Sequence, residues 1–233
     1  MDRPITTLFM LMSVDGKIST GSTDELDFDK DLPNIAGAKE GLGQYYDIEQ
    51  TTDLWSFNTG RVQAKMGVNT LGLPDKTPVS FVLMDNHHLN EHGIHYFCAR
   101  SQQVVLITNN AKHPAFQVSE DNLHIIYGED LPDALVRLKN EYGCERLTVQ
   151  SGGTINGMFL RKKLIDYVDI VVAPLLIGGK ETSTLIDGTS LVSVDELSGI
   201  GVDVPRSKYF EGKRHETLQK QETKQYLASF RVF

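Results

Sequence analysis

The 233-residue chain has few of the residues that mark several large classes of protein. Its two cysteines, Cys98 and Cys144, are too few for a disulfide framework and form no Cys-x-x-Cys metal pair, which favours a reducing cytoplasm. No apolar run approaches the roughly 20 residues that a membrane-spanning helix requires. No basic leader precedes the first apolar run, so we expect neither a signal peptide nor a membrane location.

Positive charge is also scarce. Lysine and arginine total 23 against 31 aspartates and glutamates, a net charge of −8, and no basic tract is present. Nucleic-acid surfaces carry clustered positive charge, so the chain is not expected to bind nucleic acid. Any anionic ligand must therefore be held by a local positive site.

What is present is an alternation of β-prone runs and helix-like periodicity, which is typical of an α/β domain of three layers. Its sheet would be mostly parallel, with antiparallel strands at the C-terminal edge. No repeat, linker or shift of composition divides the chain, so residues 1–233 are predicted to form a single domain. We expect strands at 5–13, 54–57, 79–84, 104–108, 123–127, 147–150 and 167–173, helices at 36–50, 61–66, 131–142 and from 153, loops at 19–33 and 174–179, and two final β-prone runs at about 209–219 and 223–233.

The most informative segment follows the strand predicted at 147–150. Gly152 and Gly153 lead there into a helix-period apolar pattern. Glycines leave no Cβ to block a ligand, and the start of a helix directs free N–H groups and a positive dipole end at an anion. This pattern is typical of a phosphate seat for a nucleotide cofactor; the alternative is a tight turn without a ligand.

Two other turns carry candidate residues. Ser13-Val-Asp-Gly-Lys17 ends the first strand, and ligands of open α/β sheets lie beyond the carboxyl ends of strands. Gly60 and Arg61 open an early helix, with Lys65 one turn beyond, and two cations on one helix face suit a phosphate. The alternatives are an ordinary Asp-Gly turn and a solvated basic face.

A cluster of four histidines and an acidic segment at 24–31 are interpreted as surface loops and not as functional sites. The histidines lack matched carboxylates or cysteines, so a surface loop is favoured over a zinc site and no metal is expected. The acidic residues favour a solvated loop over a hidden general acid. The four histidines are His87, His88, His92 and His95.

Taken in order, these motifs resemble the reductase domain of bacterial riboflavin biosynthesis. The matching pieces are Ser-x-Asp-Gly-Lys, an early Gly-Arg, a late Gly-Gly and the Ala-Pro-x-x-x-Gly-Gly that ends at Gly179. The resemblance covers roughly residues 4–180. It implies a dihydrofolate-reductase-like fold, hydride transfer from NADPH, a small-molecule substrate of pyrimidine or pterin type and a homodimer.

The resemblance also implies roles for single residues. Gly60 and Arg61 would meet the adenosine phosphates, while Ser13 and Asp15 would lie near the nicotinamide and substrate. Asp15 is the nearest candidate for a catalytic proton donor, although its carboxylate can instead cap the turn and an ordered water can serve. The cofactor pyrophosphate would be lined by Gly153, Thr154, Ile155 and Asn156.

The chain departs from the family where substrate would bind. The riboflavin enzymes usually have a glutamate where Ser151 stands, and a helix arginine that the stretch 41–52 lacks. The zinc deaminase signature is absent, so the chain cannot deaminate. We therefore predict weak or absent turnover of the family's phosphoribosylaminouracil substrate, despite competent NADPH binding.

Three functions remain open at this point. The first is an NADPH-dependent reductase resembling 5-amino-6-(5-phosphoribosylamino)uracil reductase. The second is a pterin or dihydrofolate reductase, which would require a buried carboxylate from Glu40, Asp47 or Glu49. The third is a non-catalytic NADPH-binding protein, since fold alone does not decide activity.

Overall fold

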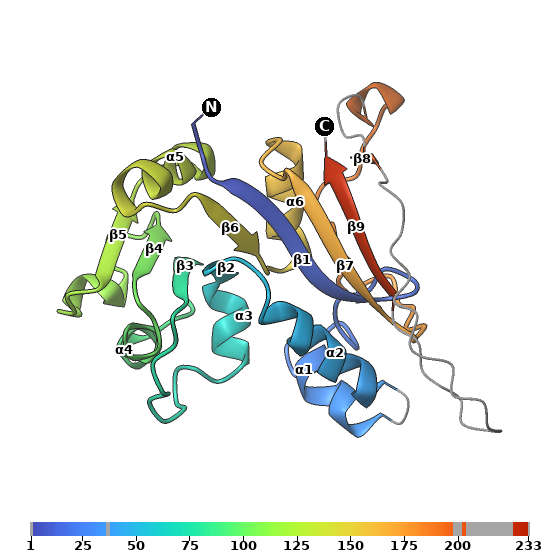
Figure 1. Ribbon diagram of the computed structural model, residues 1–233, viewed down its shortest axis with the longest axis horizontal. Coiled ribbons are helices and arrows are strands. Elements are labelled where there is room, and N and C mark those ends of the chain that lie inside the picture. The colour runs from blue at the N-terminus through green and yellow to red at the C-terminus, as the bar shows by residue number, and fades with distance from the viewer. Residues whose placement is uncertain (1, 36–37, 198–201, 204–225, 233) are drawn as a thin grey trace. The chain divides into compact units, whose positions relative to one another are not determined.

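The computed structural model describes residues 2–35, 38–197, 202–203 and 226–232 (Figure 1). The chain forms two compact units. The first comprises Met1–Thr7 and Asp53–Gly152, and the second comprises Leu8–Thr52 and Gly153–Phe233.

The first unit is built on five parallel strands in the order β5-β4-β3-β2-β6. Every residue of Val104–Thr108 is buried, as expected for a β-branched run in a parallel sheet covered on both faces. Its strands are β2 (Trp55–Thr59), β3 (Ser80–Met84), β4 (Val104–Thr108), β5 (Leu123–Tyr127) and β6 (Arg146–Val149), and its helices are α3 (Gly60–Lys65), α4 (Glu91–Arg100), η2 (Pro114–Gln117) and α5 (Leu131–Tyr142).

The second unit contains the antiparallel part of the sheet. Strand β7 pairs antiparallel with β9, and β9 pairs antiparallel with β8. Phe9 and Tyr45 stack in its core with their ring centroids 4.9 Å apart. Its elements are most of β1 (Ile5–Ser13), then α1 (Phe28–Asp31), η1 (Leu32–Asn34), α2 (Lys39–Glu49), α6 (Gly153–Arg161), β7 (Tyr167–Ala173), η3 (Val194–Leu197), β8 (Val202–Asp203) and β9 (Tyr226–Val232).

The α/β class with a mostly parallel sheet is confirmed, and the strands predicted at 5–13, 104–108, 123–127 and 167–173 have the predicted bounds. The run at 209–219 lies outside the described residues. Within the described part of the chain, no helix is both long and apolar enough to cross a membrane.

Two segments predicted as irregular contain helices. The expected loop at 19–33 includes α1, because the Asp27 side chain caps this helix by accepting from the backbone N–H of Asp29. Phe28, the first residue of α1, is buried in the core. The expected histidine loop runs into α4, because Asn90 caps its first turn by accepting from the N–H of Gly93. His92 and His95 therefore lie on a helix, and the prediction that all four histidines share a surface loop is wrong.

Candidate functional site

The two glycines that precede and open α6 have different surroundings. A Cβ added to Gly152 would meet nothing within 4 Å. A Cβ added to Gly153 would overlap the carbonyl oxygen of Thr184 and the carboxylate of Asp187. Position 153 therefore requires glycine because the chain's own 184–187 turn packs on it. Gly152, in contrast, leaves open space in which a ligand can approach the backbone.

The remaining residues of the first turn of α6 also face different ways. Thr154 is exposed and Ile155 is partly buried. Asn156 is fully buried, and its Nδ2 donates a hydrogen bond to the carbonyl of Leu185 over 2.9 Å. Among the three side chains, that of Thr154 is the most accessible to a cofactor, while the side chain of Asn156 is committed to its own unit. A cofactor at this turn stays a prediction.

The Ser13–Lys17 turn binds a loop of its own chain. The carboxylate of Asp15 accepts hydrogen bonds from the Ser13 hydroxyl at 2.5 Å, from the backbone N–H of Gly178 at 2.6 Å and from that of Ile177 at 3.2 Å. The Ser13 hydrogen bond, followed by that of Gly178, lowers the pKa of Asp15 to about 2. At neutral pH Asp15 is thus an ionised acceptor, a state that suits loop anchoring better than proton donation. Its catalytic role stays a prediction.

Lys17 completes this anchor and was not among the predicted site residues. Its ammonium donates to the carbonyls of Gly179 at 2.6 Å and Thr182 at 2.9 Å, and the residue is only 9% exposed. The signal that could have identified it is a cation directly after a turn at the end of a buried strand.

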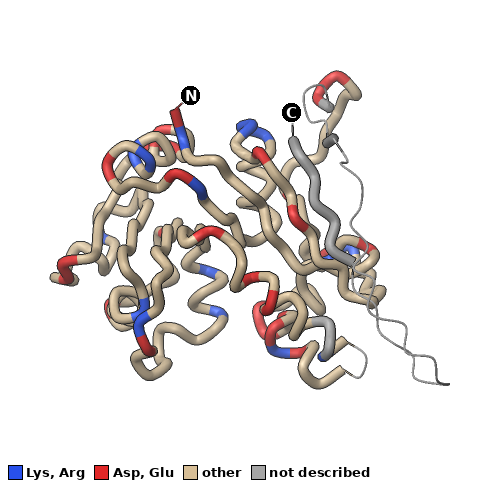
Figure 2. Tube along the Cα trace, in the orientation of Figure 1, with Lys and Arg blue, Asp and Glu red and all other residues tan. Residues whose placement is uncertain are grey.

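In the first unit, the start of α3 carries the predicted phosphate-binding residues. Arg61 is exposed and Lys65 is partly exposed, and these cations of α3 are visible as blue segments in Figure 2. Gly60 is buried, and a Cβ there would overlap the carboxyl group of Asp85. Gly60 thus has a packing role, and its contact with a cofactor stays a prediction.

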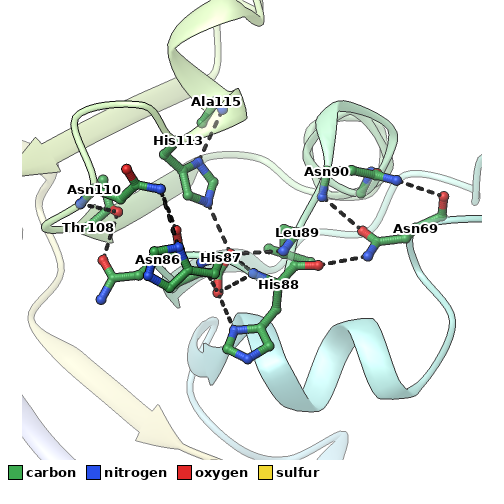
Figure 3. A network of polar contacts seen from close by, with 12 residues as sticks. Asn69, Asn86, His87, His88, Leu89, Asn90, Thr108, Asn110, His113 and Ala115 are labelled. Carbon is green, nitrogen blue, oxygen red and sulfur yellow. Dashed lines mark hydrogen bonds and ion pairs between the residues drawn. The ribbon is translucent and has the colours of Figure 1, made fainter.

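Asp85 directly follows β3 and takes part in a polar network. Figure 3 shows this network, with His88, Leu89 and His113 among its labelled residues. Its carboxylate accepts from the backbone N–H groups of Leu89 at 2.8 Å and His88 at 3.1 Å, and it lies 2.9 Å from Nδ1 of His88. His113 contributes Nε2 at 3.0 Å, and since its Nδ1 accepts from the N–H of Ala115, the proton lies on Nε2.

This network keeps Asp85 ionised. Burial raises the pKa of Asp85, but the hydrogen bonds from His113, Leu89 and His88 together outweigh burial and hold the pKa well below its usual range. Sequence reasoning missed Asp85, although an aspartate directly after a buried strand was the available signal.

A second polar chain runs from the residue after β6 through β2 to α3. Ser56 Oγ donates to Gln150 Oε1, Asn58 Nδ2 donates to Ser56 Oγ, and Gln63 Nε2 donates to Asn58 Oδ1, each over 2.9 Å. The side chain of Gln150 is thus committed to β2. The next residue, Ser151, is 3% exposed, so its short side chain lies largely out of solvent.

The four histidines have separate partners. His92 contacts the carbonyl of Leu71, His95 contacts Glu120, His88 contacts Asp85, and His87 lies 3.5 Å from the side chain of Asn110. Within the described ranges, no group of three histidine, cysteine, aspartate or glutamate residues is arranged to hold a metal ion.

The carboxylates considered for a folate substrate are not buried where the structure describes them. Asp47 is exposed and Glu49 is partly exposed. A dihydrofolate site would need one of them shielded from water. The geometry of α2 therefore gives no support to the dihydrofolate alternative.

Comparison with known sequences gives consistent matches. The family model described as the RibD C-terminal domain matches residues 4–206. A protein of Methanothermobacter thermautotrophicus, named 2,5-diamino-6-ribosylamino-4(3H)-pyrimidinone 5′-phosphate reductase, is 26% identical over 213 residues, which cover 88% of this chain and 93% of that protein. A protein of the same name from Archaeoglobus fulgidus is 30% identical over 81 residues, 33% of this chain and 37% of that protein.

Solved structures share the fold at low sequence identity. Acinetobacter baumannii RibD matches with a TM-score of 0.68 and 14% identity, covering 100% of this chain and 59% of that one. The riboflavin biosynthesis reductase Rib7 of Saccharomyces cerevisiae matches with a TM-score of 0.58 and 12% identity, covering 100% of this chain and 91% of that one. The chain thus spans about three fifths of the length of the Acinetobacter protein and nearly the whole of the yeast one.

Proposed function

Because the chain belongs to the RibD C-terminal domain family, as its motifs predict, we propose that it is an NADPH-dependent reductase of 2,5-diamino-6-ribosylamino-4(3H)-pyrimidinone 5′-phosphate. The observation that carries the proposal is the match to the Methanothermobacter reductase, which extends over 93% of that protein. The relatives support an oxidoreductase of riboflavin biosynthesis, and we propose the cofactor and the substrate.

The chemistry follows from the substrate's ribosylamino group. This group is a cyclic N,O-acetal, which opens to an imine with an electrophilic carbon. NADPH supplies the hydride for that carbon, and a proton adds to the imine nitrogen, so the product is an open-chain amine and the cofactor becomes NADP⁺. The protein's contribution is to orient the imine and to exclude water.

The start of α6 fits a bound dinucleotide. Gly152 presents backbone with no atom within 4 Å of the place that a Cβ would take. Thr154 is exposed in the first helical turn and can donate from its hydroxyl to a pyrophosphate oxygen. We assign Gly152, Gly153, Thr154 and Ile155 to the pyrophosphate through their backbone, and Thr154 also through its side chain.

Arg61 and Lys65 are assigned to the adenosine 2′-phosphate. Both lie on α3, and Arg61 is exposed. A guanidinium can hold a phosphate through two parallel hydrogen bonds, which makes Arg61 the stronger candidate for selecting NADPH over NADH.

The substrate assignment agrees with the departures in sequence. Ser151 is uncharged where the uracil reductases usually have glutamate. A reductase that accepts the diaminopyrimidinone acts on a base that has not been deaminated. We infer that Ser151 faces a base with a different hydrogen-bonding pattern from uracil. A homodimer and a cytoplasmic location remain predictions.

The test is to incubate the purified protein with NADPH and the diaminopyrimidinone phosphate and to follow both the loss of NADPH absorbance and the mass of the product. The proposal requires a product that has gained two hydrogen atoms for each NADPH consumed. NADPH binding without any product would instead support the non-catalytic alternative, and turnover of dihydrofolate in its place would support the folate alternative.

A further inference from the structure

One irregular segment of the second unit contacts both motifs that were predicted to serve cofactor and substrate. We call residues 174–187 the strap. The structure assigns no helix or strand to the strap, apart from an isolated bridge between Thr184 and Lys17. A segment of 14 residues without regular structure must be held by other contacts, and these contacts are concentrated at two places.

The first place is the Ser13–Lys17 turn. Asp15 accepts from the backbone of the strap at Ile177 and Gly178, and the ammonium of Lys17 donates to the strap at Gly179 and Thr182. A carboxylate and an ammonium two residues apart thus bind opposite kinds of backbone group. Hydrogen bonds to charged groups are about twice as strong as neutral ones, so this end of the strap is firmly held.

The second place is the first turn of α6. The N–H of Asp187 donates to the carbonyl of Gly153 over 2.9 Å, and Asp187 in turn accepts from the hydroxyl of Thr184 at 2.5 Å. A Cβ on Gly157 would overlap the carbonyl oxygen of Asp187. The strap therefore packs directly on the helix that Gly153 opens.

Leu185 joins these two places within one residue. Its N–H donates to the carbonyl of Gly16 over 3.1 Å, and its carbonyl accepts from Nδ2 of Asn156 over 2.9 Å. Asn156 is fully buried and Leu185 is partly buried, so the donor of this hydrogen bond is shielded from water. The backbone N–H of Leu185 thus binds the turn, and the backbone carbonyl of the same residue binds the helix.

We propose that Lys17 and Asn156 are positioning residues, which act through the strap to hold the Ser13–Lys17 turn and the first turn of α6 in one fixed arrangement. The benefit for the enzyme rests on the proposed function: the family resemblance implies that the turn lies near the nicotinamide and substrate, and we assign the helix to the pyrophosphate. Neither side chain needs to touch the cofactor, because each binds the strap.

The linkage itself can be measured without any cofactor, by hydrogen–deuterium exchange on the full chain. Lys17→Met keeps much of the side chain's length but removes the ammonium. We expect amide exchange in 174–187 to rise by about tenfold or more, and exchange in the first turn of α6 to rise with it, as expected when two charged-donor hydrogen bonds are lost. Strand β4, in the other unit, should be unchanged.

Lys180→Met is the matched control, because Lys180 is an exposed lysine within the strap itself. It should leave exchange in α6 unchanged. Should Lys17→Met fail to fold, Asp187→Asn tests the same linkage from the helix end, with exchange expected to rise in the Ser13–Lys17 turn. A rise that stops at the strap, or an equal rise in Lys180→Met, would overturn the proposal.

The consequence for the cofactor is tested by a double-mutant cycle on the dissociation constant of NADPH. We expect Lys17→Met and Asn156→Ala each to weaken NADPH by about tenfold and the double variant by less than the product of the two effects, since both act through one strap. Lys17→Arg should restore most of the affinity. Independent effects would contradict the proposal, whereas a wild-type protein that binds no NADPH would contradict the proposed function and leave the exchange result to decide the linkage.

Discussion

His113 donates a hydrogen bond from Nε2 to Oδ2 of Asp85 over 3.0 Å, with the two side chains 0% and 1% exposed. Gly60 packs against the same carboxyl group so closely that a Cβ at this position would overlap it, so the first residue of α3 has to be glycine. The anchor of the Gly60–Arg61 motif is thus an aspartate and a histidine that lie 25 and 53 residues further along the chain.

Asp85→Asn should destabilise the protein by about 3 kcal/mol or more. The amide would turn an N–H₂ group toward donors such as Leu89 N–H, and hydrogen bonds to a charged acceptor contribute roughly 1.5–3 kcal/mol each. Chemical denaturation measures the change in the free energy of unfolding. The control is Asp121→Asn, at an exposed aspartate, for which a change within about 0.5 kcal/mol is expected.

The contribution of Asp85 to the free energy of unfolding should disappear in acid. Its pKa in the folded protein is lowered, so the stability that it contributes is present above the pKa of an unfolded aspartate, about 3.9, and is lost as the pH falls toward the folded value. The gap in unfolding free energy between the wild type and Asp85→Asn should therefore be constant from pH 7 to pH 5 and should narrow below about pH 4. A gap that widens in acid would show that Asp85 is protonated in the native state.

The two glycines at the start of α6 should respond differently to substitution. Gly153→Ala forces a Cβ against Thr184 and Asp187, and such overpacking costs about 1–3 kcal/mol, so the melting temperature should fall by several degrees. Gly152→Val enters open space, so it should leave the melting temperature nearly unchanged while it weakens NADPH at least about tenfold. Unaltered NADPH affinity in a stable Gly152→Val protein would rule out a cofactor at this turn.

Arg61→Ala should lower the affinity for NADPH by about 10- to 150-fold and leave NADH nearly unaffected, since a charged hydrogen bond contributes roughly 1.5–3 kcal/mol. Fluorescence titration with each cofactor measures both constants. Lys112→Ala, at an exposed lysine of the same unit, is the control for a general loss of positive charge. Equal losses for NADPH and NADH would assign Arg61 a structural role.

The parts of the fold that were predictable are those that depend on nearby residues. The strand Val104–Thr108 is a continuous run of β-branched residues and one leucine. Helix α5 follows from Pro132 in its first turn and is capped by Gly143, which has a φ of 74°. Helix α4 was missed because its histidines and its glycine obscure the apolar period, although the cap at Asn90 was a usable signal.

The parts of the site that were not predictable depend on residues far apart in sequence. Gly60 and Gly153 each open a helix, as the sequence pattern predicts, but the reason for Gly153 lies in the 184–187 turn and that for Gly60 lies in Asp85. Likewise, Asp15 was seen as a candidate acid, while its partners at Ile177 and Gly178 lie more than 160 residues away. Local patterns reveal where a glycine or a charged residue stands in a motif, whereas the group that packs on it or binds it is brought near only by folding.

The most direct test of the account compares two substrates at equal concentration in an NADPH-oxidation assay. One is 2,5-diamino-6-ribosylamino-4(3H)-pyrimidinone 5′-phosphate, and the other is its deaminated form, 5-amino-6-(5-phosphoribosylamino)uracil. We predict a kcat/KM of about 10⁴ M⁻¹s⁻¹ or above for the first, in the ordinary range of enzymes. For the uracil, Ser151 cannot supply the charged hydrogen bond of the glutamate that the uracil reductases usually have, so kcat/KM should be lower by about 10- to 150-fold. Equal or faster reduction of the uracil, or reduction of neither compound, would contradict the account.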